Sequence, residues 1–283
     1  MSLIATVVLF HPEKEVFENI RSLLDEVESV LLIDNSEPCM ESTFLLQFNA
    51  SEQSKIILLS NQENFGIAKA LNQAAVYAIE NKFQWLLTMD QDSFFEKGSL
   101  KRMKEFITTT KEAVGVVSPF HLTPKSKLPQ FKEVTTQLRF TMTSGNLLNL
   151  EVYNKCGAFD EKLFIDSVDH EYCLRLRKNG YPIIRVNAAT LHHTLGDIAY
   201  HPFLFFRFKT TNHSPDRRYY IARNRLYVMF KYLYFDFKFF RREFGHYCKD
   251  FLRVIFLEER KKEKLLAIIK GTVHFMIGRF GKL

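Results

Sequence analysis

Short apolar runs alternate with amphipathic stretches along the first third of the chain. Runs of roughly four to eight apolar residues are typical of buried strands, whereas apolar residues that recur every three or four positions indicate a helix. This pattern predicts helices over 13–27 and 66–81, and strands over 3–10, 30–33, 56–59 and 85–89. Strands that alternate with helices predict an α/β, Rossmann-like fold with a mostly parallel central sheet flanked by helices and joined by right-handed crossovers.

The pattern is less regular over 113–150, which contains three prolines. An alternating stretch up to Thr143 predicts a strand that leads into Ser144-Gly145-Asn146. The elements expected after it are a short helix over 151–157, a helix over 168–179, and a last buried strand over 182–186.

Polar side chains follow three of the four strands expected in the first third of the chain. They are Asp34-Asn35-Ser36, Asn61 with Asn64, and Asp90-Gln91-Asp92-Ser93. In open α/β sheets ligands bind outside the carboxyl ends of the strands, so three polar endings on one edge predict a shared crevice. The Gly-x-Gly-x-x-Gly fingerprint is absent after the first strand, which argues against a nicotinamide or flavin enzyme.

Asp90 and Asp92 lie one residue apart, directly after the buried run 85–89. Hard divalent cations such as Mg²⁺ and Mn²⁺ prefer oxygen ligands and often share them with substrate phosphates. The alternative is a solvated turn, because Asp and Ser also favour turns and helix caps. The two other polar strand ends favour a cation and phosphate site.

The segment from Asn64 to Asn72 lies where a loop enters a helix. Gly66 would let the backbone approach a ligand closely, and the N-terminus of a helix favours anions. The alternative is a plain helix start with Asn64 as its cap.

Three acids, Asp166, Asp169 and Glu171, surround the start of the helix expected over 168–179. Acids in a first turn complement the helix dipole, which is one explanation. A carboxylate near the substrate could instead take a proton from an attacking hydroxyl. His192-His193 follow the last expected strand, where a histidine could ligate the same cation, bind a phosphate or be purely structural.

Arg217, Arg218 and Arg223 recur at helical spacing in a segment that also contains Tyr219-Tyr220. Planar guanidinium groups suit the recognition of a diphosphate. The alternative is a solvated basic face of a helix.

The overall composition is that of a globular protein, with 46% hydrophobic and 25% charged residues. The four cysteines lie far apart and form no Cys-x-x-Cys pair, which argues against a structural zinc site and a disulfide framework, and favours the cytoplasm. The N-terminus lacks the features of a secretory signal, and no run is long and apolar enough to predict a membrane-spanning helix.

Positive charge and aromatic residues concentrate toward the C-terminus. Residues 217–283 hold about 17 Lys and Arg against about 6 Asp and Glu, whereas the rest of the chain carries a slight negative charge. We therefore expect a catalytic domain over 1–212 and a basic, aromatic helical extension over 213–283.

The end of this extension has an amphipathic pattern. Its apolar residues at helical spacing are Leu265, Ile268, Ile269, Val273, Met276 and Phe280. A cationic amphipathic helix can lie in the interface of a membrane with anionic lipids. The alternative is a helical pair that packs on the catalytic domain, and both hold if one face packs while another meets lipid. Nucleic acid is not expected as a partner, because no recognition motif accompanies the charge.

Several of these motifs, in this order, resemble those of the inverting family 2 glycosyltransferases with the GT-A fold, and among them the bacterial rhamnosyltransferase-like branch. The resemblance runs from Ala5 to about Asn224. The matching segments are Asn64-Phe65-Gly66-Ile67-Ala68 with Asn72, Asp90-Gln91-Asp92-Ser93, Ser144-Gly145-Asn146, Val168-Asp169-His170-Glu171, and Arg217-Arg218-Tyr219-Tyr220 with Arg223-Asn224. The chain departs from the family at Val168, where many relatives carry an acid.

The resemblance implies transfer of a sugar from a nucleoside diphosphate donor, dTDP-rhamnose or else a UDP-hexose, to a hydroxyl of a growing cell-surface polysaccharide. It implies Asp169 as the general base, with Glu171 and Asp166 as alternatives. The implied ligands of an Mg²⁺ or Mn²⁺ cofactor are Asp90, Asp92, His192 and His193. The implied donor-binding residues are Asp34, Asn64, Gly66, Asn72, Asp90, Gln91, Arg217, Arg218 and Arg223, and the implied acceptor region is Ser144, Gly145 and Asn146.

A glycan carried on a polyprenyl diphosphate would present its acceptor hydroxyl at the membrane. The resemblance and the basic extension together predict a cytoplasmic enzyme that associates peripherally with the inner face of a bacterial plasma membrane.

Two other functions fit parts of the pattern. A phosphotransferase of the haloacid dehalogenase type also carries Asp-x-Asp at a strand end, but there the pair follows the first strand and not the fourth. A catalytically silent, membrane-associated adaptor of the same fold would retain the motifs without transferring a sugar.

Overall fold

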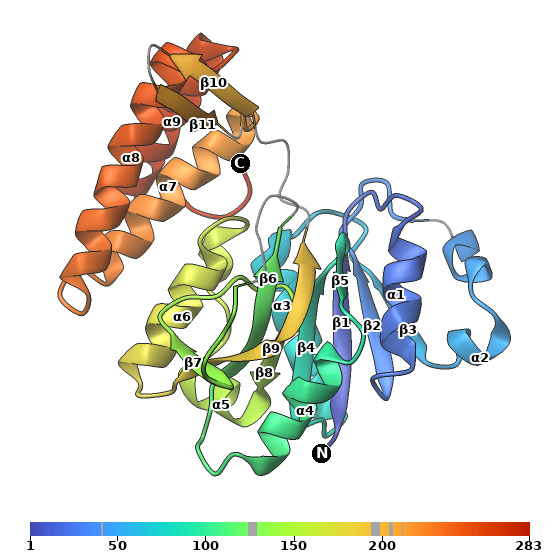
Figure 1. Cartoon of the computed structure of the whole chain (residues 1–283). Helices are drawn as coiled ribbons and strands as arrows, with labels where there is room; N and C mark the ends of the chain where they lie inside the picture. The colour runs from blue at the N-terminus through green and yellow to red at the C-terminus, as the bar shows by residue number, and fades with distance from the viewer. Residues whose placement is uncertain (41, 124–128, 194–198, 204–205, 211) are drawn as a thin grey trace. The chain divides into compact units, whose positions relative to one another are not determined.

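The computed structural model describes residues 1–40, 42–123, 129–193, 199–203, 206–210 and 212–283 (Figure 1). The chain divides into two compact units. The sheet unit comprises Met1–Asp160 and Tyr172–Thr194, and the helical unit comprises Glu161–Glu171 and Leu195–Leu283. The division into a catalytic domain over 1–212 and a helical extension over 213–283 stays a prediction.

A mixed sheet of nine strands forms the centre of the sheet unit. Its strands are β1 (Leu3–Leu9), β2 (Ser29–Asp34), β3 (Ile56–Ser60), β4 (Trp85–Asp90), β5 (Ser93–Phe95), β6 (Val116–Leu122), β7 (Thr135–Leu138), β8 (Asn146–Asn149) and β9 (Ile183–His193). They lie in the order β3-β2-β1-β4-β8-β6-β9-β5, with β7 also paired to β9. The first four are mutually parallel and β6 is parallel to β9, whereas β8, β5 and β7 run antiparallel to their partners.

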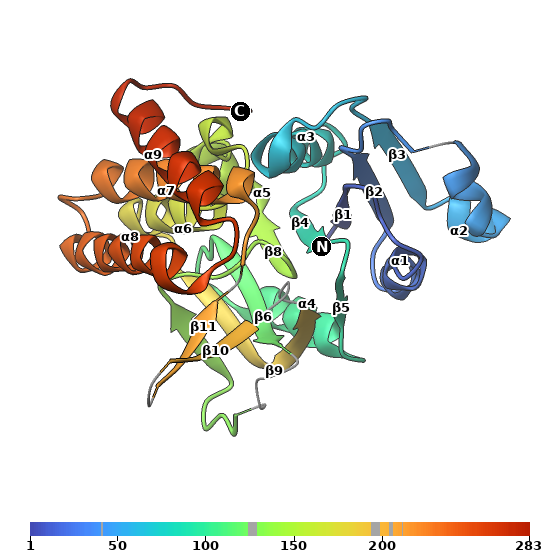
Figure 2. The ribbon, with the colours of Figure 1, turned by 90° about the horizontal axis from the view of Figure 1, so that it is seen from above.

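Helices cover both faces of this sheet, as expected. Figure 2 shows α3 (Gly66–Glu80) and α5 (Leu150–Cys156) on one face, and α1 (Val16–Leu24) and α4 (Ser99–Thr109) on the other. The short segments η1 (Ser42–Gln47) and α2 (Ala50–Gln53) precede β3. Strands covered on both faces read as continuous apolar runs, and Ile4, Leu31 and Leu86 accordingly have no exposed surface.

The strand expected over 182–186 is longer in the structure. β9 continues from Ile183 to His193, so His192-His193 end the strand and do not follow it. The polar Asn187 in its middle interrupts the apolar pattern, but Asn187 Nδ2 donates to the carbonyl oxygen of Glu133 at 2.8 Å and β9 continues past it. The sequence pattern also does not predict β5, because a strand of three residues carries no periodic signal.

Three long helices dominate the helical unit: α7 (Pro215–Lys231), α8 (Phe237–Leu257) and α9 (Lys261–Met276). The segment η2 (Glu161–Leu163) and an antiparallel hairpin of β10 (Ala199–Phe203) and β11 (Phe206–Thr210) precede them. The helix α6 (Val168–Lys178) belongs to the helical unit as far as Glu171 and to the sheet unit from Tyr172. In the described ranges, no helix is both long and apolar enough to span a bilayer.

A glycine sets the approach of α9 to α7. A Cβ atom added at Gly271 would lie 2.5 Å from the carbonyl oxygen of Tyr219, so only a residue without a side chain fits at this crossing. Buried Ile268 packs beside it with Ala222. One face of the predicted amphipathic helix therefore packs within the helical unit.

Candidate functional site

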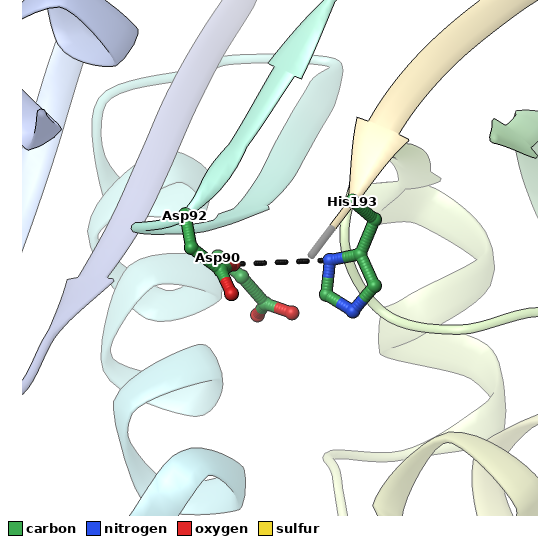
Figure 3. Close-up of side chains that lie close together, drawn as sticks. All are labelled: Asp90, Asp92 and His193. Atoms are coloured by element: carbon green, nitrogen blue, oxygen red, sulfur yellow. Dashed lines mark ion pairs between the residues drawn. The ribbon is translucent and has the colours of Figure 1, made fainter. Parts of the chain in front are cut away.

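Strand pairing brings the Asp-x-Asp motif next to a histidine a hundred residues later in the chain. β4 ends at Asp90, and β5 begins at Ser93, which pairs with His193 of β9. Asp90, Asp92 and His193 each offer a ligand atom, and these atoms all lie within 4.8 Å of one another. Figure 3 shows the two carboxylates and the imidazole pointing toward one another, with Asp92 Oδ1 3.8 Å from His193 Nδ1.

The chemistry of this group fits a divalent cation. Two carboxylates and one imidazole supply the oxygen-rich, mixed set of ligands that Mn²⁺ and Mg²⁺ accept. The Asp92 side chain is 48% exposed and that of His193 12% exposed, so the group is largely buried on one side and open to solvent on the other. His192 lies outside this group, and its ring stacks on Phe94 with the centroids 4.7 Å apart.

The strand predicted up to Thr143 ends at Leu138 as β7, and Ser144 and Gly145 lie in a turn before β8. This turn holds the end of β4 in place. Ser144 Oγ accepts the backbone N–H of Asp90 at 3.0 Å, and His121 Nε2 donates to the carbonyl oxygen of Ser144 at 2.7 Å. Gly145 has a φ of 78°, and a Cβ there would lie 2.8 Å from a methyl carbon of Leu191. This segment therefore fixes the backbone of the candidate site, and its close packing explains the glycine.

Other polar residues of the motif regions brace the loops of the sheet unit. Gln91 accepts the N–H of Phe10 at 2.8 Å and donates to its carbonyl oxygen at 3.2 Å, which ties the loop after β4 to that after β1. Asn146 donates to the carbonyl oxygen of Met142. In both cases the side chain bonds to backbone atoms, so these residues fix the course of the loops around the site.

Asp34 lies beneath a cavity and does not line it. Its buried carboxylate accepts the N–H groups of Ser36 at 2.9 Å and of Met40 at 2.7 Å, and so shapes the loop after β2. That loop and the one after β1 line an open cavity of about 540 Å³, and His11 and Ser36 are among its lining residues. The sequence pattern indicates Asp34, which supports this loop, and Ser36, which lines the cavity, but it gives no signal for His11.

The segment at the start of α3 is a structured turn. Asn64 Oδ1 accepts the N–H of Gly66 at 2.9 Å, and Gly66 has a φ of 82°. Asn72 lies buried farther along the helix and accepts both the N–H of Phe159 and the hydroxyl of Tyr153. Asn64 and Gly66 therefore belong to the sheet edge that carries the candidate site, whereas Asn72 joins α3 to the segment after α5.

The three candidate bases have different surroundings within the helical unit. Arg217 binds both oxygens of Asp166, at 2.9 and 3.1 Å. Glu171 is fully buried, and its Oε1 accepts from Lys231 Nζ and from the Tyr232 hydroxyl, each at 2.9 Å. The Asp169 side chain is 26% exposed.

His170 contacts the Asp169 carboxylate and shifts its pKa. Its backbone N–H donates to Asp169 Oδ1 at 2.7 Å, and its Nδ1 lies 3.1 Å from the same oxygen. Burial by itself would raise the pKa of Asp169, but the charge and hydrogen bonds of His170 outweigh burial and hold this pKa below its usual value. Conversely, burial opposes the charge on His170, but Asp169 outweighs it and raises the pKa of His170.

Two of the three predicted arginines are occupied inside the helical unit. Arg218 is buried and pairs with Glu258. Arg223 has no exposed surface; its guanidinium donates to the carbonyl oxygens of Gly281 at 2.8 Å and Lys162 at 3.2 Å. These contacts hold the helices and the end of the chain together, and they leave neither guanidinium at the surface. Arg217, 46% exposed, is the accessible one of the three.

Comparison with known proteins gives the family. The model of glycosyl transferase family 2 matches residues 6–160, which is more than half of the chain. The dTDP-rhamnosyl transferase RfbF of Shigella flexneri is 28% identical, and the match covers 81% of this chain and 80% of that protein.

Solved glycosyltransferases share the fold. The S. aureus TarS fragment 1–349 in complex with UDP-GlcNAc superposes with a TM-score of 0.65 at 14% identity, and the match covers 99% of this chain and 84% of that one. GalNAc-T7 with UDP, GalNAc and Mn²⁺ gives a TM-score of 0.58 at 14% identity, over 78% of this chain. The chain spans 48% of GalNAc-T7 and 40% of a longer TarS chain.

These findings decide between sugar transfer and the phosphotransferase alternative. The family model covers the Asp-x-Asp motif, and the sheet that presents it is the one found in solved glycosyltransferases. The chain belongs to glycosyl transferase family 2.

Proposed function

We propose that this glycosyltransferase is inverting and metal-dependent, and that it transfers rhamnose from dTDP-rhamnose to a hydroxyl of a growing bacterial polysaccharide. The observation that carries the proposal is the group of Asp90, Asp92 and His193 at the carboxyl end of β4. The choice of donor is supported by the similarity to the dTDP-rhamnosyl transferase of Shigella flexneri. UDP-hexoses are the alternative donors.

Asp90, Asp92 and His193 would hold Mg²⁺ or Mn²⁺. When bound, the cation neutralises charge on the diphosphate leaving group. The mixed oxygen and nitrogen ligands support this assignment, and so does the Mn²⁺ of GalNAc-T7, which shares the fold. Gln91 and Ser144 position the backbone that carries these ligands.

The nucleotide part of the donor would bind along the edge formed by the loops after β1, β2 and β3. The cavity near His11 and Ser36 supports this location, since strand ends of this kind bind nucleotides in α/β sheets. Asn64 and Gly66 shape the neighbouring turn, where backbone N–H groups at the start of α3 favour a phosphate. Asp34 acts indirectly by holding the loop after β2.

Asp169 is the proposed general base. Arg217 binds both oxygens of Asp166, whose side chain is 18% exposed, and Glu171 is buried against Lys231. Asp169, at 26%, is the most exposed carboxylate of the three. The pKa of Asp169 is held below its usual value, so the carboxylate is ionised at neutral pH and can accept a proton, but as a weaker base than an unperturbed aspartate.

The proposed reaction is one displacement at the anomeric carbon. The acceptor oxygen forms a bond to this carbon on the face opposite the leaving group, while the bond from the carbon to the diphosphate oxygen breaks. The hydroxyl proton passes to Asp169, and the electron pair of the broken bond leaves with the nucleoside diphosphate. A single displacement inverts the configuration of the sugar.

The proposed acceptor is a glycan on a polyprenyl diphosphate at the inner face of the plasma membrane. Two apolar stripes of the helical unit support contact with a membrane. The exposed members are Phe237, Phe244, Leu252 and Phe256 on α8, and Leu266, Ile269, Val273 and Met276 on α9. Exposed Lys238, Arg241 and Lys249 lie along α8, and a cationic surface with aromatic side chains favours anionic lipid.

A panel of nucleotide sugars tests the choice of donor. Binding of dTDP-rhamnose, UDP-glucose, UDP-galactose and UDP-galactofuranose is measured by calorimetry with and without Mn²⁺. The proposal expects dTDP-rhamnose to bind at least tenfold more tightly than the others, because a site that hydrogen-bonds the hydroxyls of one sugar rejects a donor that leaves its polar groups unpaired. A preference for any UDP-hexose would replace rhamnose with that sugar.

A further inference from the structure

A buried serine lies between two of the proposed cation ligands. Ser93 follows Asp92 in the chain and pairs with His193 across the strands β5 and β9. It is 1% exposed. Its Oγ lies 2.8 Å from His193 Nδ1 and 3.4 Å from Asp92 Oδ1, so a single hydroxyl contacts both side chains.

The count of protons restricts how these contacts form. A serine hydroxyl has one proton, an ionised carboxylate can only accept, and a neutral imidazole donates from one nitrogen and accepts at the other. If Ser93 donates its proton to Asp92, its oxygen must accept from Nδ1–H of His193. The lone pair of His193 then lies on Nε2, where a cation can use it.

The opposite orientation of the Ser93 hydroxyl leaves no lone pair on Nε2 for a cation. If the hydroxyl proton of Ser93 points to Nδ1, the ring proton of His193 lies on Nε2 and that atom cannot bind a cation. Asp92 would also lose the hydrogen bond from Ser93. One hydroxyl orientation therefore satisfies both contacts that the structure contains, and the other satisfies one.

We propose that Ser93 is a positioning residue of the cation site. Its hydroxyl accepts from Nδ1–H of His193 and donates to Asp92. It therefore selects the tautomer whose Nε2 lone pair is available to a cation, and it fixes the positions of the two ligands relative to each other. This inference rests on the proposed roles of Asp92 and His193 as ligands. Outer partners of this kind typically change metal affinity by about 10- to 100-fold.

The tautomer can be measured in the wild-type protein without metal. Protein with ¹⁵N-labelled histidine is studied by two-bond ¹H–¹⁵N correlation at mildly alkaline pH, where neutral imidazole prevails. The signals of His193 are assigned by comparison with His193→Asn. The proposal expects the proton on Nδ1, and a proton on Nε2 would overturn it. The metal site of the proposed function is tested separately, by Mn²⁺ binding to the wild-type protein.

Metal affinity provides the second test. Titration of Mn²⁺ followed by electron paramagnetic resonance should show binding weakened about 10- to 100-fold in Ser93→Ala and nearly restored in Ser93→Thr, which keeps the hydroxyl. The matched control is Ser99→Ala. Ser99 is equally buried, and its Oγ accepts the N–H of Thr190 in the same strand β9 at 2.9 Å, away from the ligands.

The outcomes separate the two claims. Equal Mn²⁺ affinity in Ser93→Ala and Ser99→Ala would overturn the role of Ser93. A wild-type protein that binds no Mn²⁺ would overturn the metal site of the proposed function, whereas the tautomer of His193 is decided in the metal-free protein.

Discussion

Lys231 Nζ lies 2.9 Å from Glu171 Oε1, and the Glu171 carboxylate has no exposed surface. The pair joins the first turn of α6 to the last turn of α7. A buried carboxylate without its cation is costly, so removal of the lysine should destabilise the fold.

We expect Lys231→Met to lower the free energy of unfolding by about 1 to 3 kcal/mol, less than for a fully buried pair because the Lys231 side chain is 34% exposed. Urea unfolding followed by circular dichroism measures this. The control is Lys155→Met, which breaks the exposed pair with Glu151 on α5 and should leave the midpoint of unfolding unchanged. Equal midpoints for the two variants would contradict a structural role for Glu171.

The assignment of Asp169 as the base gives a different prediction. Asp169→Asn should lower kcat by about 10²- to 10⁴-fold, because the amide cannot take the proton of the acceptor, while donor affinity stays near wild type. The unfolding midpoint should fall, because the ion pair with His170 is lost. Single-turnover transfer and donor calorimetry measure the two parts. Near wild-type turnover in this variant, with a large loss in Asp166→Asn, would move the base to Asp166.

The pair of Asp169 and His170 predicts a pH dependence of stability. The raised pKa of His170 stabilises the fold fully below the pKa of an unfolded imidazole, about 6.5, and this contribution is lost as pH rises through the raised folded value. The lowered pKa of Asp169 stabilises the fold above the pKa of an unfolded aspartate, about 3.9, and this contribution is lost as pH falls through the lowered folded value.

Between these limits both groups are charged. We therefore expect His170→Gln to destabilise the protein more at about pH 5.5 than at about pH 9.5, where wild-type His170 is itself neutral. Urea unfolding of both proteins at the two pH values measures the difference. The same cost at both pH values would show that the charge of His170 does not contribute.

The exposed stripe on α8 predicts binding to anionic vesicles. Replacing Phe244 and Phe256 together with serine should reduce sedimentation with vesicles that contain phosphatidylglycerol by roughly tenfold or more, because the burial of two aromatic side chains is lost. Binding of the wild type should also weaken as salt rises. The control replaces Leu46 and Val76, two exposed apolar residues of the sheet unit, with serine. A wild-type protein that stays in the supernatant at low salt would rule out the membrane proposal.

Sequence patterns predict the parts of this site that depend only on residues near one another in the chain. The run 85–89 predicts β4, and the polar residues after it predict a ligand edge, because strand burial and strand ends are local features. The pairing of Ser93 with His193 depends on the register between β5 and β9. These strands lie a hundred positions apart in the chain, so no local sequence pattern predicts their register. The sequence therefore predicts both His192 and His193 as ligands, and the structure separates them.

Tertiary packing also separates the acids. Asp169 and Glu171 lie two positions apart on one helix, so they point to different sides of it. Which side is buried depends on the end of α7, where Lys231 and the following residue, Tyr232, contact Glu171. In the same way, the sequence places Arg217 and Arg223 on one helix, but the burial of Arg223 depends on the end of the chain folding back over it.

The most direct test of the central claim is the dependence of donor binding on the cation group. Calorimetry should show that dTDP-rhamnose binds the wild-type protein in the presence of Mn²⁺, and that binding weakens at least tenfold in EDTA or in Asp92→Asn, because the diphosphate then lacks its counter-charge. Donor binding of equal affinity with Mn²⁺, in EDTA and in Asp92→Asn would contradict a metal-dependent site at Asp90, Asp92 and His193.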